Sequence, residues 1–361
     1  MLRFTPNLKH LELKDVKLVD RNNNKFKLEN LEKLKVSETH AGILDSLEKI
    51  VTKPLKKFTF LSEGFCFNRY NANTNIESDV EAQQKIINFI STRQEMLEEI
   101  NIHPVKYTSE QLLQLRQCKL KKLIIERHNF ESKAIYERNL LDFVRAQPTL
   151  EKLVMNEPLS VKVANEISQS LPNLKQLTVH TTNCEGFNMN LFFRTMNNLQ
   201  ILYLAGESQL DYVNDCQLPK LKEFILSVTK VKGDSLQRFL KHSTSLNQLS
   251  LVGCHFDNWS NFMSLLVQLK ALKCLMIIFT GEFITSHDQF ASEAKLGIER
   301  LRTMKIMDYG NLTFDELSTL LGMCPELRFL NLKGVVEPLQ ERLAQTVCRK
   351  LTKLETFYAD V

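Results

Sequence analysis

The sequence predicts an α/β solenoid, a fold in which short strand-and-helix units repeat along the chain. The first observation is a leucine spacing, L-x-x-L-x-L, which is clearest at Leu327, Leu330 and Leu332 in the segment CPELRFLNLKG. The second is that this spacing recurs from near the first residue to near the last. The third is the interval between copies, which for most of them is 22 to 30 residues, as in leucine-rich repeats.

The repeat count and the facing of the strands follow from the same positions. The residue after each first leucine is polar or charged, so apolar and polar positions alternate as in a strand with one buried face. We therefore expect a leucine-rich repeat horseshoe with a concave parallel β-sheet and convex helices, forming a single domain over residues 1–361. It has about 14 irregular repeats, beginning at Leu8, Leu31, Leu55, Leu97, Leu120, Leu150, Leu174, Leu199, Leu221, Leu246, Leu272, Leu301, Leu327 and Leu354.

The segments between the strands have the spacing of amphipathic helices. The segment DELSTLLGMC places its apolar side chains on one helical face. Thr313 and Glu316 have the spacing of a capping box at the start of this helix, and Thr108 and Gln111 have it before LLQL. One unit alone cannot bury its strand and helix leucines, so neighbouring units should stabilise one another.

One interval is longer than the others, and both ends of the array lack a polar cap. The third repeat, from Leu55 to Leu97, is expected to contain a loop insertion at about 62–78, either a mobile surface insertion or a binding loop. The end faces are expected to be uncapped, so the sequence is a fragment or something outside it covers those faces. The apolar residues expected there are Leu8, Leu11, Leu13, Leu354 and Phe357.

Composition and charge indicate an intracellular protein that binds neither nucleic acid nor membranes. The net charge is +5, and Lys and Arg are dispersed among Glu residues, so we interpret the charge as a source of solubility. No stretch is long and apolar enough to span a membrane, and the N-terminus does not resemble a signal peptide. The eight cysteines form no C-x-x-C pair, which favours free thiols in the cytoplasm or nucleus.

The sequence contains no motif for catalysis, cofactor binding or metal binding. It has no Gly-rich phosphate loop, H-E-x-x-H, G-x-S-x-G or zinc knuckle. His103 and His180 share a strand position, but three repeats separate them, too far to share a metal ion. Cys118, Cys254 and Cys324 recur at repeat positions and are expected to be small buried core residues. We therefore expect no enzyme activity, cofactor or metal.

The outward strand positions differ between the two ends of the chain. In the first repeats they are charged: His10, Glu12, Lys14, Lys33, Lys35, Lys57, Lys122, Glu126 and Arg127. From the eighth repeat they are mostly apolar or aromatic: Ile201, Tyr203, Ile225, Val228, Val252, Met276, Ile278, Phe279, Met307, Phe329 and Tyr358.

Apolar residues at solvent-facing strand positions predict a patch that needs a partner. One alternative is that a loop or a terminus of the chain covers part of the patch. The other is that the assignment of inward and outward residues is shifted by one position in a unit such as LMIIF. The predicted partner-binding residues are Ile201, Tyr203, Ile225, Val252, Met276, Ile278, Met307, Phe329, Asn331 and Tyr358.

Two segments, LTFDELSTLLGMCPELRFLNLKGV and LQRFLKHSTSLNQLSLVGC, carry a more specific pattern. They resemble repeats of F-box leucine-rich repeat proteins, the substrate receptors of cullin-RING ubiquitin ligases. In that family a helix ends in Cys-Pro, the leucine spacing follows, and a cysteine often stands three residues later. Cys324 and Pro325 match the first part, Cys254 matches the second, and Cys118 before Leu120 is a partial match.

The resemblance implies that a protein substrate is held on the concave face, near a ubiquitin-charged enzyme. In this family an F-box, which docks on the adaptor Skp1, normally precedes the repeats, and this sequence contains none. Skp1 and cullin are therefore expected to bind only through an F-box outside this sequence. Such a ligase accelerates ubiquitin transfer by holding the substrate close to the charged enzyme, and the receptor itself does no bond chemistry.

Two other interpretations stay open. The alternative is a stand-alone leucine-rich repeat scaffold or inhibitor, similar to ribonuclease-inhibitor-like proteins, with no link to ubiquitin. That family's repeats are regular with alternating lengths, whereas the repeats here are irregular. An enzyme attached to a solenoid is the third interpretation, and it requires catalytic residues outside this sequence.

Overall fold

The structure is a computed structural model. It describes residues 7–14, 16, 27–37, 43–61, 76–93, 96–103, 108–125, 133–158, 160–180, 192–206, 217–228, 233–254, 256–279, 284–286, 297–307, 313–334, 345, 347 and 349–360. The described chain divides into two compact units, Met1–Glu157 with Gln169–Leu174, and Pro158–Ser168 with Lys175–Val361. The expectation of one domain over 1–361 stays a prediction.

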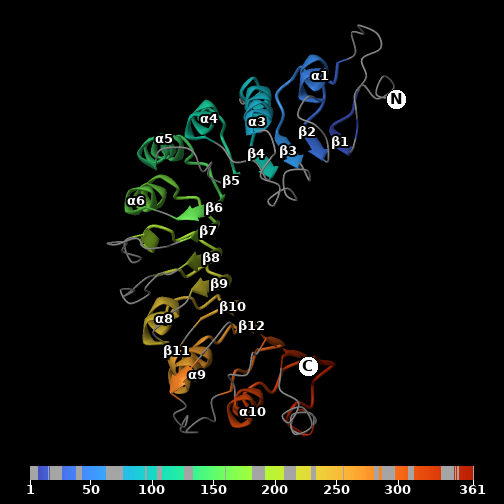
Figure 1. The fold of residues 1–361 in the computed structure, drawn as a ribbon. Coiled ribbons are helices and arrows are strands. Elements are labelled where there is room, and N and C mark those ends of the chain that lie inside the picture. Colours follow the sequence, from blue (N-terminus) through green and yellow to red (C-terminus); the bar gives the residue numbers. More distant parts are fainter. Residues whose placement is uncertain are drawn as a thin grey trace. The chain divides into compact units, whose positions relative to one another are not determined.

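The first unit contains parallel strands that pair in sequence order, with helices on one side of them (Figure 1). Its strands are β1 (His10–Lys14), β2 (Lys33–Ser37), β3 (Lys57–Leu61), β4 (Glu99–His103), β5 (Lys122–Ile125) and β6 (Lys152–Pro158). Its helices are α1 (Ile43–Ile50), α3 (Ile76–Ser91), α4 (Ser109–Gln114) and α5 (Lys133–Arg145).

The second unit continues the same pattern of parallel strands and connecting helices. Helix α6 (Val161–Ser170) precedes its first strand. The strands are β7 (Gln176–His180), β8 (Ile201–Gly206), β9 (Glu223–Val228), β10 (Gln248–Val252), β12 (Cys274–Ile278), β14 (Thr303–Met307), β15 (Phe329–Lys333) and β16 (Thr356–Asp360). Helices α8 (Gly233–Leu240), α9 (Trp259–Gln268) and α10 (Phe314–Gly322) lie between them in sequence.

The register of the strands confirms the predicted leucine-rich repeat fold. Residues at the same repeat position are Cα partners on neighbouring strands, so one position of the repeat forms a continuous row. The central leucine position forms such a row in the second unit, and its members are fully buried: Leu202, Phe224, Leu249, Leu275, Met304 and Leu330. The period of two residues thus buries one face of every strand, as expected.

The predicted helix starts and core cysteines are also confirmed. Thr313 and Thr108 form capping boxes with Glu316 and Gln111, respectively. The Cys324 thiol is fully buried and donates a hydrogen bond of 3.1 Å to the Leu320 carbonyl, and burial raises its pKa to about 12. Burial also raises the pKa of the Cys118 thiol to about 12, and Cys254 is buried as well. These thiols pack the core.

Other parts of the structure were not predicted or differ from expectation. A second parallel pair, β11 (Phe256–Asn258) with β13 (Ile284–Ser286), follows the exits of β10 and β12. The expected loop at 62–78 falls mainly outside the described residues, and α3 begins at Ile76.

The residues expected on the end faces differ in burial. Leu13 is buried, whereas Leu8, Leu11 and Leu354 are half-buried and Phe357 is 37% exposed. The uncapped ends stay a prediction. None of the described helices combines the length and apolar character that crossing a bilayer requires.

A buried arginine, which was not predicted from the sequence, joins two helices of the first unit. Arg93 follows α3 and is only 8% exposed. Its guanidinium donates hydrogen bonds of 2.9 and 3.2 Å to the carbonyl of Val51 and one of 3.2 Å to that of Glu48, both at the C-terminal end of α1. It also lies 4.2 Å from the Phe89 ring centroid. Arg93 thus satisfies carbonyls that a helix end leaves without partners.

We expect Arg93→Ala to lower the free energy of unfolding by about 3 kcal/mol, because buried carbonyls lose a charged donor. The measurement is urea unfolding followed by circular dichroism. Lys85→Ala is the matched control, because Lys85 also links α3 to α1, through an exposed ion pair of 3.4 Å with Asp45. The control should change stability by less than about 1 kcal/mol. Equal effects of the two variants would contradict the role assigned to Arg93.

Candidate functional site

The predicted partner-binding residues all lie on the strand face that is not buried against the helices. Except for Tyr358, whose neighbours Phe357 and Ala359 are exposed, they alternate along their strands with buried residues, as the predicted facing requires. Tyr358 is 57% exposed, and the others are half-buried. Glu126, Arg127 and the side chain of Val228 lie outside the described residues. Whether this face binds a partner stays a prediction.

Phe279 is the one described residue whose predicted facing was wrong. It is 1% exposed, and its backbone N–H donates a hydrogen bond of 2.9 Å to the Met307 carbonyl. Ile278, the residue before it, faces outward. Consecutive strand residues point to opposite faces, so Ile278 and Phe279 cannot both belong to the outward surface.

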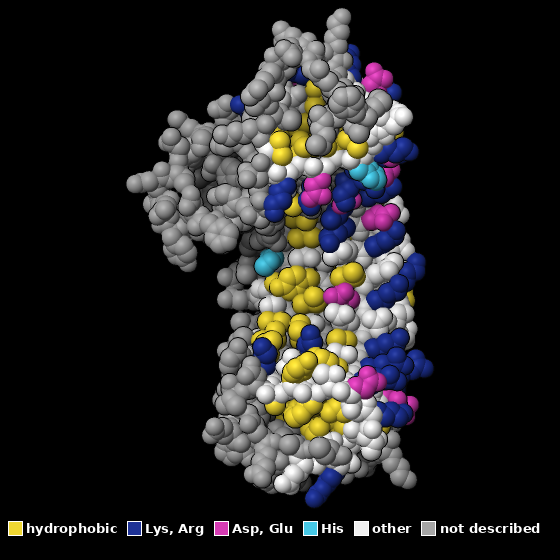
Figure 2. Space-filling model, turned by 90° about the vertical axis from the view of Figure 1, so that its right-hand side faces the viewer, with side chains coloured by type: hydrophobic (Ala, Val, Ile, Leu, Met, Phe, Trp, Pro, Cys, Tyr) yellow, Lys and Arg dark blue, Asp and Glu magenta, His cyan; other side chains and the backbone are white. Residues whose placement is uncertain are grey.

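The outward apolar residues of β8 to β14 form a connected surface, here called the apolar stripe. Its members are Ile201, Tyr203, Ile225, Val252, Met276, Ile278 and Met307. Val252, Ile278 and Met307 are Cα partners across β10, β12 and β14, and Tyr203 pairs with Ile225 across β8 and β9. Figure 2 shows hydrophobic side chains gathered on this face, with Lys and Arg side chains along one edge.

Ser250 connects the two parts of the stripe. It stands between Ile225 and Met276 in the same row, and it is only 1% exposed although it occupies an outward position. Its larger neighbours therefore close over it. The stripe continues across β10 without a charged residue in this row.

A lysine separates the stripe from the aromatic residues of the last two strands. Lys305 follows Met276 in register, and its Nζ lies 5.8 Å from the Phe329 ring centroid. Phe329 and Tyr358 form a tilted ring pair with centroids 5.8 Å apart. Beside Lys305, Asn331 is half-buried, and its side-chain oxygen has no hydrogen-bond partner among the described residues. The predicted single patch is therefore two patches.

Polar residues on the same face were not predicted, because the prediction for these strands used only the apolar outward positions. Besides Lys305, Glu223 and Gln248 occupy outward positions on β9 and β10 and share a hydrogen bond of 3.2 Å. The alternation that placed the apolar residues would have placed these three as well. His180, on β7, lies beside Tyr203 of the stripe. The two rings are edge-on, with centroids 6.4 Å apart.

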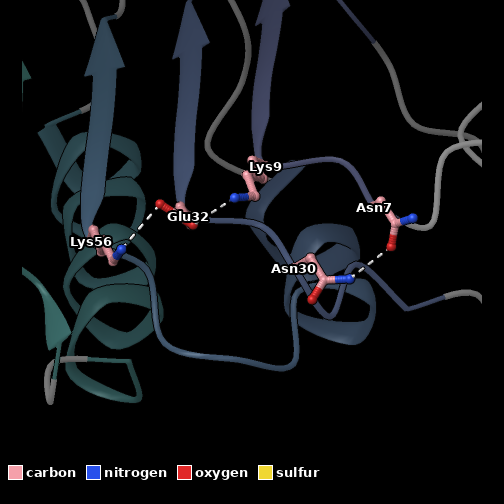
Figure 3. A network of polar contacts seen from close by, with 5 residues as sticks. All are labelled: Asn7, Lys9, Asn30, Glu32 and Lys56. Atoms are coloured by element: carbon pink, nitrogen blue, oxygen red, sulfur yellow. Dashed lines mark hydrogen bonds and ion pairs between the residues drawn. The ribbon is translucent and has the colours of Figure 1, made fainter.

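In the first unit the residue immediately before each strand forms an entry row of alternating charge. The row consists of Lys9, Glu32, Lys56, Glu98, Lys121 and Glu151. Glu32 pairs with Lys9 at 3.7 Å and with Lys56 at 3.1 Å, and Asn30 bonds to Asn7 beside them (Figure 3). Lys121 pairs with Glu98 at 2.9 Å, and this bond raises the pKa of Lys121.

The first residue of each strand in this unit forms a second row, here called the first outward row. It consists of His10, Lys33, Lys57, Glu99, Lys122 and Lys152. One carboxylate oxygen of Glu99 lies 2.9 Å from Lys57 Nζ and 3.2 Å from Lys122 Nζ. Burial opposes ionisation of Glu99, but these two hydrogen bonds outweigh it and lower its pKa.

The described residues offer no group of His, Cys, Asp and Glu side chains arranged to hold a metal ion. His103 and His180 belong to β4 and β7, in different units. Side chains suited to packing and ion pairing dominate the outward face that the structure describes. Such a face can bind another macromolecule through apolar contact and charge.

Comparison with known proteins adds little to this description. No protein-family model matches the chain, and no curated protein matches it. Among solved structures, the chain is similar to an internalin from Listeria monocytogenes, with 14% sequence identity over 99% of this chain and 88% of that chain and a TM-score of 0.48. The fold assignment rests on the register and burial of this chain's own residues.

The lowered pKa of Glu99 predicts a specific pH dependence. A carboxyl whose pKa is lower in the folded state stabilises the protein above its unfolded-state pKa, about 4.5, and loses this contribution as the pH falls through the folded value. Glu99→Gln should therefore lower stability at pH 7, by at most about 1 kcal/mol, and the difference should shrink as the pH falls below about 4.5. Urea unfolding at several pH values measures it. A difference that does not change as the pH is lowered through the acid range would show that the charge of Glu99 is not the cause.

Proposed function

We propose that this chain is a protein-binding leucine-rich repeat domain that holds a partner protein against the apolar stripe. One observation carries the proposal: apolar outward side chains of β8 to β14 lie in register with one another, Tyr203 beside Ile225 and Val252 beside Ile278 and Met307. Contiguous exposed apolar surface on a soluble protein is typical of an interaction site.

The composition of the stripe fits the centre of a protein interface. Tyr203 and Met276 are of types enriched at such centres, and both are half-buried, so little freedom remains to be lost on binding. Glu223, Gln248 and Lys305 provide polar groups at its border, where interfaces are usually hydrated.

We further propose that the partner is a substrate for ubiquitin transfer, with the chain acting as the recognition part of an SCF-type ligase receptor. The support is the resemblance of the repeats around Cys254 and Cys324 to those of F-box leucine-rich repeat proteins. Both cysteines are buried, and the Cys324 thiol donates a hydrogen bond to the preceding helix. We therefore assign them a role in packing the repeats and no catalytic role. Skp1 and cullin would be recruited through an F-box outside this sequence.

The double substitution Tyr203→Asp with Met276→Asp should reduce partner capture at least tenfold, because it places two carboxylates in an apolar contact. Capture is measured by cross-linking the purified chain in cell extract and comparing recovered proteins quantitatively. The melting temperature should stay within a few degrees of the wild-type value. A large fall in melting temperature would show that these side chains belong to the core.

The matched control is Gln217→Asp with Ser245→Asp, which adds the same charge at exposed loop positions before β9 and β10. Partners retained by the wild-type and the control but lost from the stripe variant are specific. Capture by the stripe variant at the wild-type level would reject the stripe as the binding surface.

A fusion tests the ubiquitin proposal separately. The chain by itself should not bind purified Skp1, whereas the chain fused to an F-box should assemble with Skp1 and cullin and ubiquitinate a captured partner. The fusion carrying the stripe substitutions should assemble but not ubiquitinate. Binding of Skp1 to the chain without an F-box would contradict the assignment, and an active assembly that leaves the partner unmodified would reject the receptor role.

A further inference from the structure

The two charged rows of the first unit follow different rules although they lie side by side on the same strands. In the entry row the sign alternates at every step from Lys9 to Glu151. In the first outward row the positions of β2 to β6 read Lys33, Lys57, Glu99, Lys122, Lys152. The first row is electrically balanced, and the second carries four lysines for one carboxylate.

This imbalance places like charges directly opposite one another in the sheet. Lys33 is the Cα partner of Lys57, and Lys122 is the Cα partner of Lys152. Like charges at directly opposite positions are destabilising. Lys57 and Lys122 are compensated by Glu99, but neither Lys33 nor Lys152 makes an ion pair within the part of the chain that the structure describes. The repulsion therefore remains in the isolated chain.

Glu99 shows how this row holds a carboxylate. It is seated between lysines of two neighbouring strands, with one oxygen within 3.2 Å of both ammonium groups. We propose that the first outward row of β2 to β6 is a binding surface for an acidic peptide segment, whose carboxylates are held by Lys33 and Lys152 at the two ends of the row. This surface belongs to the first unit and shares no residue with the apolar stripe, so it stands independently of the proposed function.

The electrostatics of Lys152 agree with an excess of positive charge. Partial burial lowers the pKa of Lys152, and repulsion by Lys122 lowers it further, while Glu99 acts in the opposite direction. An additional carboxylate beside Lys152 would relieve the repulsion and compensate for the lost solvation. A lysine that only faced solvent would experience neither the repulsion nor the loss of solvation.

The neighbouring side chains favour a peptide over a nucleic acid. On β5 and β6 the next outward row consists of Ile124 and Val154, which are half-buried and offer apolar contact, whereas Thr59 on β3 is buried. Among the described residues of these two rows on β2 to β6 there is no aromatic side chain on which a base could stack, and no arginine.

The experiment measures binding of a short fluorescein-labelled poly-glutamate peptide to the full chain by fluorescence anisotropy at low salt. The wild-type chain should bind it, and added salt should weaken binding because the contacts are ionic. Lys33→Gln with Lys152→Gln should weaken binding about tenfold, since each lysine contributes one exposed ion pair. Absence of binding by the folded wild-type chain would overturn the proposal.

Lys56→Gln with Lys121→Gln is the matched control, because it removes the same net charge from the adjacent entry row. These lysines are already paired with Glu32 and Glu98, so affinity should change by no more than about twofold. An equal loss in both double variants would mean that net charge alone attracts the peptide, which contradicts a site at the first outward row. Circular dichroism melts establish that all variants are folded.

Glu99→Gln gives a prediction of opposite sign. The substitution frees Lys57 and Lys122 from their internal carboxylate, so poly-glutamate should bind several-fold more tightly than to the wild-type chain. A role limited to holding the sheet together predicts no gain. The same assay with a fluorescein-labelled oligo(dT) tests nucleic acid as the ligand of this row. Tighter binding of oligo(dT) that depends on Lys33 and Lys152 would assign the row to nucleic acid and reject the acidic peptide.

Discussion

Parallel pairing in constant register is the constraint on which the rest of this structure depends. No single unit can bury its leucines, so each strand must lie beside the next with equivalent positions aligned. Once Leu249 is the partner of Leu275, Ser250 and Met276 on the opposite face are partners too. The hydrophobic core therefore dictates which outward side chains become neighbours, although those side chains do nothing to determine the register.

The consequence is that a bias at one repeat position becomes a surface property. A lysine at the first strand position in successive repeats produces a row of ammonium groups with about 4.8 Å between strands. Residues whose charge alternates from repeat to repeat at the preceding position produce a balanced row of ion pairs. Apolar residues at the outward positions of β8 to β14 produce the apolar stripe. The two units thus present different outward side chains on a shared type of core.

Features that appear functional in a sequence of this kind can be structural. Cys324 and Pro325 suggested a relationship to ubiquitin-ligase receptors, yet the cysteine is explained by packing and by its hydrogen bond to Leu320. The residues that can contact a partner lie beside the motif, and the structure separates them into the apolar stripe and the Phe329–Tyr358 pair, with Lys305 between. Function in this fold is therefore sought at the outward positions.

The sequence by itself determined the fold class, the inward and outward facing of most strand residues, both capping boxes and the burial of the core cysteines. These depend on local periods of two and 3.6 residues, which short segments reveal. Only the tertiary structure decided that Lys33 opposes Lys57, that Lys305 separates the apolar stripe from Phe329 and Tyr358, and that Arg93 satisfies carbonyls of α1. The physical reason is that irregular repeat lengths hide the register, and the register sets every contact between strands.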